Sequence, residues 1–106
     1  MTELSINEIS VSDNALRLAV EGEVDMASSG ELRDAIRRSL AAAGIRQVII
    51  DLDQVPFLDS TGIRTLLDGH IAATADGKAF LVTNPQVLVR RVLLISGVLD
   101  LLTGGS

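Results

Sequence analysis

Apolar residues recur with two different periods along this sequence, which predicts strands at its start and helices alternating with strands afterwards. Residues 4–10 and 15–21 are predicted to be strands, the second with leucine and valine at every other position. The polar segment Ser12-Asp13-Asn14 between them is typical of a turn. The fold is therefore expected to open with an antiparallel hairpin.

A helix is predicted over about residues 28–43, where apolar side chains follow the helical spacing and arginines occupy other faces. Ser28 and Glu31 have the spacing of a capping box at its start, and Gly44 is suitably placed to end it.

Residues 48–52 form a short, β-branched and almost wholly apolar run, which predicts a strand covered on both faces. A second helix is predicted over about residues 60–74. Its apolar stripe consists of four residues at helical spacing, Ile63, Leu66, Leu67 and Ile71.

Asp76-Gly77 is expected to turn the chain into a further strand at 79–82. Two strand–helix–strand crossovers result, and such crossovers place their strands in parallel. We therefore predict an α/β fold with a mixed sheet of about four to five strands and helices mainly on one face. Asn84-Pro85 predicts the start of a helix that runs to about Ile95, and residues 98–102 could add a last helical turn.

Size and composition favour one domain with an aliphatic core. The chain has 106 residues, of which 47% are apolar and only 2% aromatic, with no Trp or Tyr. We expect a single domain over residues 1–103 and a flexible tail at 104–106. The net charge of −5 and the absence of an aromatic platform argue against binding of nucleic acid.

The sequence contains no cysteine, which excludes disulfides, thiolate catalysis and cysteine-based zinc sites. It also shows no secretion signal and no apolar run approaching the roughly 20 residues that span a bilayer. These features predict a cytoplasmic protein without membrane insertion.

Signatures of an enzyme are mostly absent. The sequence has no glycine-rich phosphate loop and no HExxH motif, and its single histidine, His70, is expected to pack at the edge of the core. Asp51 and Asp53 could hold a magnesium ion, but such a pair at a strand end is more often solvated or capping. We expect no catalytic activity, no metal and no cofactor.

Ser60 stands where the predicted strand at 48–52 leads into the predicted helix. Free backbone N–H groups and the positive end of the helix dipole meet at such a position and tolerate a phosphate group. An ordinary N-cap at Asp59 or Ser60 explains the same residues, and local sequence alone favours the cap.

Several motifs in the order found here resemble those of the STAS domain and, within it, the bacterial anti-sigma factor antagonists. The resemblance covers nearly the whole chain and is therefore more specific than any one tetrapeptide. It is carried by the apolar strand at 48–52, Phe57-Leu58-Asp59-Ser60-Thr61-Gly62-Ile63, Gly22-Glu23-Val24-Asp25, Asn84-Pro85, Arg91-Val92-Leu93 and Ser96-Gly97-Val98.

The resemblance implies that Ser60 is phosphorylated by a partner that is both a serine kinase and an anti-sigma factor. The unphosphorylated protein would bind that partner and free the sigma factor, and a serine phosphatase would restore this form. It further implies that Asp59 and Thr61 flank the acceptor on the partner surface, that Gly62 allows close approach of the partner, and that Asp25 lies near the acceptor.

Two other functions remain open from the sequence. The domain could be a STAS subunit of a transporter or of a multi-protein sensor complex, with Ser60 or Thr61 as a modified residue or a simple cap. It could also be a small nucleotide-binding or hydrolytic domain that uses Asp51, Asp53 and the helix start at Ser60. The missing phosphate-binding loop argues against the nucleotide hypothesis.

Overall fold

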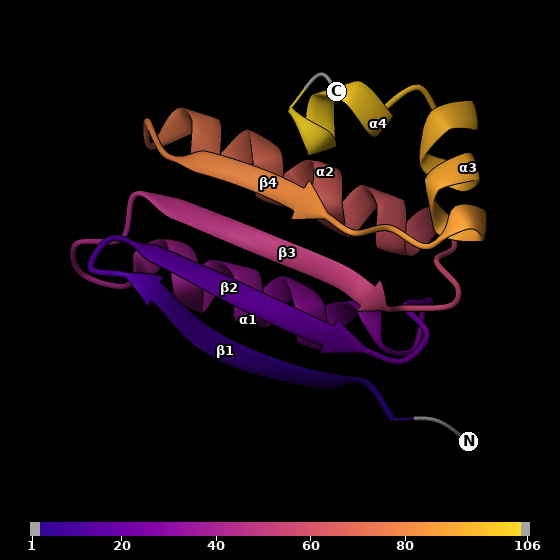
Figure 1. Ribbon diagram of the computed structural model, residues 1–106, viewed down its shortest axis with the longest axis horizontal. Helices are drawn as coiled ribbons and strands as arrows, with labels where there is room; N and C mark the ends of the chain where they lie inside the picture. Colours follow the sequence, from indigo (N-terminus) through magenta and orange to yellow (C-terminus); the bar gives the residue numbers. More distant parts are fainter. Residues whose placement is uncertain (1–2, 105–106) are drawn as a thin grey trace.

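A single four-stranded sheet in the order β1-β2-β3-β4 forms the centre of the protein. The computed structural model describes residues 3–104. β1 (Ser5–Ser12) pairs antiparallel with β2 (Ala15–Glu21), and β3 (Gln47–Gln54) and β4 (Ala79–Thr83) follow in parallel (Figure 1). The predicted hairpin and the predicted mixed sheet are thus confirmed.

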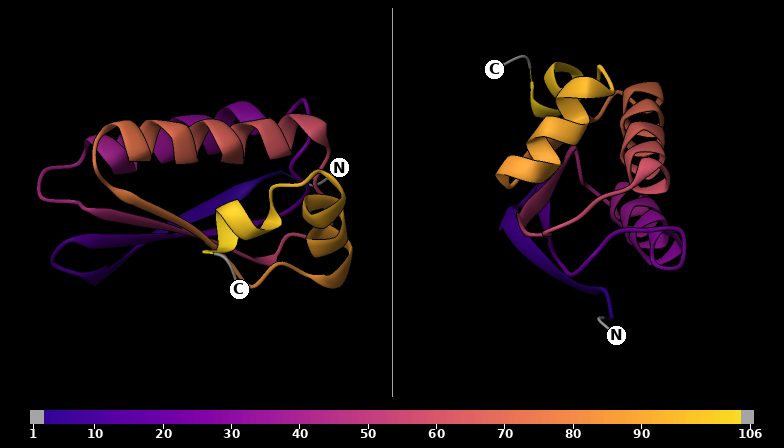
Figure 2. Two further views of the ribbon diagram at one scale, coloured as in Figure 1. Left: turned by 90° about the horizontal axis from the view of Figure 1, so that it is seen from above. Right: turned by 90° about the vertical axis from the view of Figure 1, so that its right-hand side faces the viewer.

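Two long helices cover one face of this sheet. α1 (Ser29–Ala41) and α2 (Ser60–Ala75) lie side by side as one layer, and two shorter helices, α3 (Val87–Ile95) and α4 (Leu99–Thr103), follow β4 (Figure 2). α4 packs beside β4 and confirms the helical turn expected near the end of the chain. The α/β class with helices mainly on one face is therefore confirmed.

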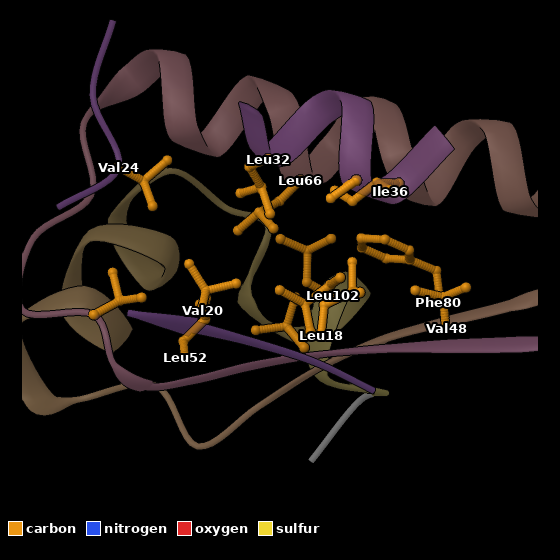
Figure 3. Packing of buried hydrophobic residues seen from close by; sticks show 14 of the residues in the cluster. Leu18, Val20, Val24, Leu32, Ile36, Val48, Leu52, Leu66, Phe80 and Leu102 are labelled. Carbon is orange, nitrogen blue, oxygen red and sulfur yellow. The ribbon is translucent and has the colours of Figure 1, made fainter. Parts of the chain in front are cut away.

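The core fills the space between the sheet and the two long helices (Figure 3). It is almost entirely aliphatic, as the composition predicted, and Phe80 is its one aromatic residue among those described. Strand and helix side chains that meet there include Leu18, Val20, Val48, Ile50, Leu52, Leu32, Ile36 and Leu66.

The face of α2 that packs on the core differs from the stripe expected from the sequence. Its buried residues are Gly62, Thr65, Leu66, Gly69 and Ala73, whereas 56% of Ile71 is exposed. The small residues decide this orientation, because a Cβ atom at Gly69 would lie only 2.9 Å from the ring of Phe80. Close packing of α2 on the sheet at Gly69 thus stabilises the fold more than burial of Ile71 would.

The strand at residues 48–52 was expected to be covered on both faces, and the structure differs here. In β3 the alternate residues Val48, Ile50 and Leu52 face the long helices and are fully buried, but Ile49 and Asp51 point the other way and are only partly buried. Figure 1 views this second face, and none of the described helices lies in front of β1, β2 or β3. The strand is therefore covered on one face and not on both.

The segment after β4 does not begin a helix at Asn84-Pro85 as expected. Asn84 has a φ of 55°, and α3 begins two residues after Pro85, with Gln86 as its N-cap residue. The Gln86 side chain donates instead to the carbonyl of Asp53 at 2.8 Å. These residues therefore connect the strand ends to α3 rather than forming its first turn.

At the C-terminal end, Gly104 ends α4 with a φ of 85°, so this residue of the predicted tail belongs to the helix cap. Residues 105 and 106 lie outside the described part of the chain. Within residues 3–104, no helix combines the length and the apolarity that a bilayer span requires.

Candidate functional site

Two loops at the carboxyl ends of the strands are joined by backbone hydrogen bonds. The N–H of Val24 donates to the carbonyl of Phe57 at 3.0 Å, and the N–H of Asp59 donates to the carbonyl of Val24 at 3.1 Å. Val24 and Leu58 thereby form a parallel β-bridge, and both side chains are buried. The bridge holds the loop after β2 against the loop before α2, and so brings Asp25 close to Asp59.

Asp59 caps helix α2. Its Oδ1 accepts the N–H groups of Thr61 at 2.9 Å and Gly62 at 3.1 Å, and also the Thr61 hydroxyl. Of the two residues that the sequence offered as a cap, the structure selects Asp59. An aspartate in this position satisfies two of the N–H groups that a helix start leaves without partners.

The same contacts lower the pKa of the Asp59 carboxyl below its usual value. Partial burial alone would raise this pKa, but hydrogen bonds from the Thr61 hydroxyl and from the N–H groups of Gly62, Thr61 and Met26 outweigh it. The group is therefore a carboxylate at neutral pH, beside the N-terminus of the helix.

Ser60 is the first residue of α2, and its side chain is exposed. Its hydroxyl has no hydrogen-bond partner within the described part of the protein, whereas the Thr61 hydroxyl donates to Asp59. Asp59 thus caps the helix, whereas its neighbour Ser60 is exposed. Ser60 presents a free hydroxyl, and Thr61 presents one that is already engaged.

Asp25 orders the loop that leads into α1. Its Oδ1 accepts the N–H groups of Ala27 at 3.0 Å and Ser28 at 3.1 Å, and its carbonyl accepts the N–H of Ser29 at 2.8 Å. The Ser28 hydroxyl lies within hydrogen-bonding distance of the Glu23 carbonyl and of Asp25. The predicted capping box is therefore absent, because Ser28 is turned back toward the loop.

An open hollow separates the two aspartates. It is lined by Asp25, Met26, Ala27 and Asp59, and 78% of Met26 is exposed. The structure thus places Asp25 near the start of α2. Ser60 follows directly after one of the lining residues.

Gly62 packs against the interior of the domain. It is buried, and a Cβ atom there would lie 2.5 Å from Leu58 Cδ1 and 3.0 Å from Val24 Cγ1. The space left by its missing side chain is filled from inside the domain. Gly62 therefore permits close packing of α2 on the bridged loops.

The remaining polar candidates form no second site. Asp51 Oδ1 accepts the N–H of Asp53 at 3.0 Å and Asn84 Nδ2 at 3.3 Å, and Asp53 accepts from Gln54 at 2.8 Å. Among residues 3–104, no three acidic or histidine side chains are grouped so that they could hold a metal ion. His70 is partly buried and contacts Phe80 edge to face, with 6.4 Å between ring centroids.

Sequence reasoning missed an exposed apolar surface on α3. Four aliphatic residues of this helix face outward and are named the α3 patch: Val87, Leu88, Leu94 and Ile95. α3 lies at the same end of the sheet as the start of α2 (Figures 1 and 2). A signal was present, because an apolar content this high in a nine-residue helix exceeds what one face can bury.

The STAS domain family model matches residues 8–104. The chain belongs to the STAS domain family. The match confirms the resemblance found in the sequence. It spans both bridged loops and the four helices described within residues 3–104.

Solved structures with the same fold include the anti-sigma factor antagonist SpoIIAA in its unphosphorylated form. Its TM-score is 0.80 at 21% identity, over 93% of this chain and 85% of that one. SpoIIAA from Bacillus in its phosphorylated form has a TM-score of 0.73 at 20% identity, over 93% and 88%.

Two further structures extend the comparison. An anti-sigma factor antagonist from Mycobacterium paratuberculosis has a TM-score of 0.76 at 24% identity, over 95% of this chain and 83% of that one. The STAS domain of a SulP transporter from Vibrio cholerae has a TM-score of 0.66 at 23% identity, over 91% and 73%. At these identities the likeness shows the fold, and the STAS fold occurs in both settings.

Proposed function

We propose that this STAS domain is an anti-sigma factor antagonist regulated at Ser60. The unphosphorylated form binds an anti-sigma factor that is also a serine kinase, and so releases the sigma factor. Phosphorylation of Ser60 abolishes this binding, and a serine phosphatase restores it. In this role the domain is a kinase substrate and a cytoplasmic switch, without catalytic activity of its own.

The observation that carries the proposal is the exposed, unpartnered hydroxyl of Ser60 next to an aspartate that already caps the helix. A kinase needs an accessible hydroxyl, and Ser60 offers one at no cost to the helix cap. Thr61 is a poorer acceptor, because its hydroxyl donates to Asp59. The likeness to a protein solved in phosphorylated and unphosphorylated forms supports the same reading.

The surroundings of Ser60 favour a block at the interface over a change of fold. A phosphate adds a charge of about −1.5 to −2, and the helix N-terminus offsets it by roughly 0.3–2 kcal/mol. In a packed interface the same group would lose its hydration beside Asp25 and Asp59. A switch from 1:99 to 99:1 needs about 5.5 kcal/mol, and repulsion together with desolvation can supply much of it.

Exposed apolar side chains around the site support a protein partner. Met26 lies in the hollow itself, Phe57 precedes the bridge, and the α3 patch lies at the same end of the sheet. A surface that combines apolar side chains with a few polar groups is typical of protein–protein contacts.

A STAS subunit of a transporter or of a multi-protein sensor complex is the second candidate, supported by the likeness to the SulP transporter domain. The nucleotide-binding hypothesis is weaker. The hollow beside Ser60 is lined by two carboxylates and by no cationic side chain, so a nucleotide phosphate would find no countercharge there.

The test is a pull-down from lysate of the source cells with the wild type, Ser60→Ala and Ser60→Asp as baits. We expect wild type and Ser60→Ala to recover an ATP-binding anti-sigma kinase and Ser60→Asp to lose it. Thr74→Asp is the matched control, because it adds the same charge to an exposed residue near the other end of α2.

The recovered kinase is then incubated with each bait and ATP, and the phosphorylated residue is located by mass spectrometry. Phosphate incorporation that persists in Ser60→Ala would overturn the acceptor assignment. Equal recovery of a transporter or scaffold by all four baits would instead support the second candidate.

A further inference from the structure

The sheet face opposite the long helices carries a row of side chains that spans all four strands. Ile9 pairs with Arg17, Arg17 with Ile49, and Ile49 with Leu81, so one residue of each strand contributes. Ile9 is 36% exposed, and the other three are partly buried. The strand residues that alternate onto this side are here called the open sheet face, and this side of the sheet is turned toward the viewer in Figure 1.

Arg17 stands in the middle of this row without a partner. Its Nε atom is buried and makes no hydrogen bond, and no ion pair to this residue exists within residues 3–104. Three aliphatic side chains share its row. The Nε–H group is therefore a buried donor for which the described residues provide no acceptor.

A suitable acceptor occurs on the same face. Asp51 pairs with Ala19, two residues beyond Arg17 on β2, and so belongs to the next row. Such diagonal neighbours are roughly 7–8 Å apart, and the described residues show no ion pair between them. Arg17 and Asp51 thus lie on the same face without pairing with each other.

We propose that the open sheet face packs against the same face of a second copy, with Arg17 of each copy paired to Asp51 of the other. A twofold contact makes this possible, because any pair of residues formed in one direction forms again in the other. The aliphatic side chains of the row would then fill the centre between two packed sheets.

Reciprocal pairing of Arg17 with Asp51 favours a second copy at this face over contact elsewhere. Each chain has a net charge of −5, so most of its surface repels a copy of itself. Glu21 and Asp53 alternate onto the same face as Arg17 and Asp51, but stand at the carboxyl ends of β2 and β3. Arg17 is the one cationic residue in the four described strands, so the two Arg17–Asp51 pairs of a twofold contact offset part of the repulsion between copies.

The available area indicates a weak dimer. Strands about 4.8 Å apart with a rise of about 3.3 Å per residue make this face roughly 400–600 Å² for each copy. Standard interfaces bury about 800 Å² on each side, so we expect a dissociation constant in the micromolar range. Ser60 begins α2, which lies on the other side of the sheet, so Ser60 stays accessible in the dimer. The test of the dimer is therefore independent of the test of the proposed function.

Sedimentation velocity from low micromolar to several hundred micromolar protein tests the dimer directly. We expect the wild type to shift from monomer to dimer. Arg17→Asp and Asp51→Arg should each weaken self-association at least tenfold, because the twofold dimer contains the Arg17–Asp51 pair twice. An equimolar mixture of the two variants should associate again, since each then supplies the charge that the other needs.

Arg46→Asp is the matched control, because Arg46 is an exposed arginine outside the row, and it should leave the association unchanged. Circular dichroism checks that each variant is folded. Amide spectra of the wild type recorded on dilution identify the surface, and shifts are expected at Ile9, Arg17 and Ile49. A monomer at all concentrations would overturn the proposal, as would shifts confined to the α3 patch or a mixture that fails to associate.

Discussion

Removal of the Asp59 side chain is the sharpest test of how the site is built. Its carboxylate accepts two backbone N–H groups at 2.9 and 3.1 Å and the Thr61 hydroxyl as well. Loss of an N-cap costs about 0.5–2 kcal/mol. Because this cap is charged and lies at the positive end of α2, we expect Asp59→Ala to cost about 1–2 kcal/mol of unfolding free energy.

The pH dependence follows from the lowered pKa of Asp59. Partial burial alone would raise this pKa, but the hydrogen bonds to the carboxylate outweigh it, so the folded-state pKa lies below the unfolded one. The charged cap therefore stabilises the protein fully above the unfolded pKa and loses its effect as the pH falls through the folded pKa. The stability difference between wild type and Asp59→Asn should thus shrink below about pH 5.

Urea unfolding followed by far-ultraviolet circular dichroism measures both effects, since the chain has no Trp or Tyr for fluorescence. In thermal unfolding, each kcal/mol corresponds to roughly 4–8 °C for a domain of this size. Ser60→Ala is the control, and it should stay within about 0.5 kcal/mol of the wild type. The reasoning is refuted if Ser60→Ala costs as much as Asp59→Ala, or if the Asp59→Asn difference is the same at acid and neutral pH.

Four further outcomes are expected in the same unfolding assay or in amide spectra. Gly62→Val should lose about 1–3 kcal/mol, because its side chain would overlap Leu58. Leu93→Ala, which empties a fully buried position of α3, should lose about 2–5 kcal/mol. Ile95→Ser on the exposed side of the same helix should change stability by no more than about 0.5 kcal/mol. Ser60→Glu should leave the fold intact, with spectral shifts confined to the start of α2.

The sequence predicted the elements well wherever one local signal was sufficient. The second strand agrees with β2 at both ends, and the helix expected to begin at Ser60 does begin there. Both rest on short-range features, namely alternation over seven residues and an Asp-Ser-Thr-Gly helix entrance. Such features act within a few residues, so the rest of the chain does not alter them.

Predicted helix caps failed where a residue from another segment of the chain takes the hydrogen bond of the capping side chain. Ser28 has the right spacing for a capping box, but Asp25 and the Glu23 carbonyl hold its hydroxyl. Asn84 is a suitable N-cap, but its side chain donates to Asp51 from a neighbouring strand. Local propensity cannot foresee these partners, because they are brought together only by the packed loops.

The sequence by itself determined the order and type of the elements, the aliphatic core and the position of an exposed serine at a helix start. Only the tertiary structure decided that Asp59 and not Ser60 caps α2, that Gly62 packs inward, and that one face of the sheet stays open. The reason is physical: periodicity and capping are properties of neighbouring residues, whereas burial and hydrogen-bond partners depend on distances between segments far apart in the chain.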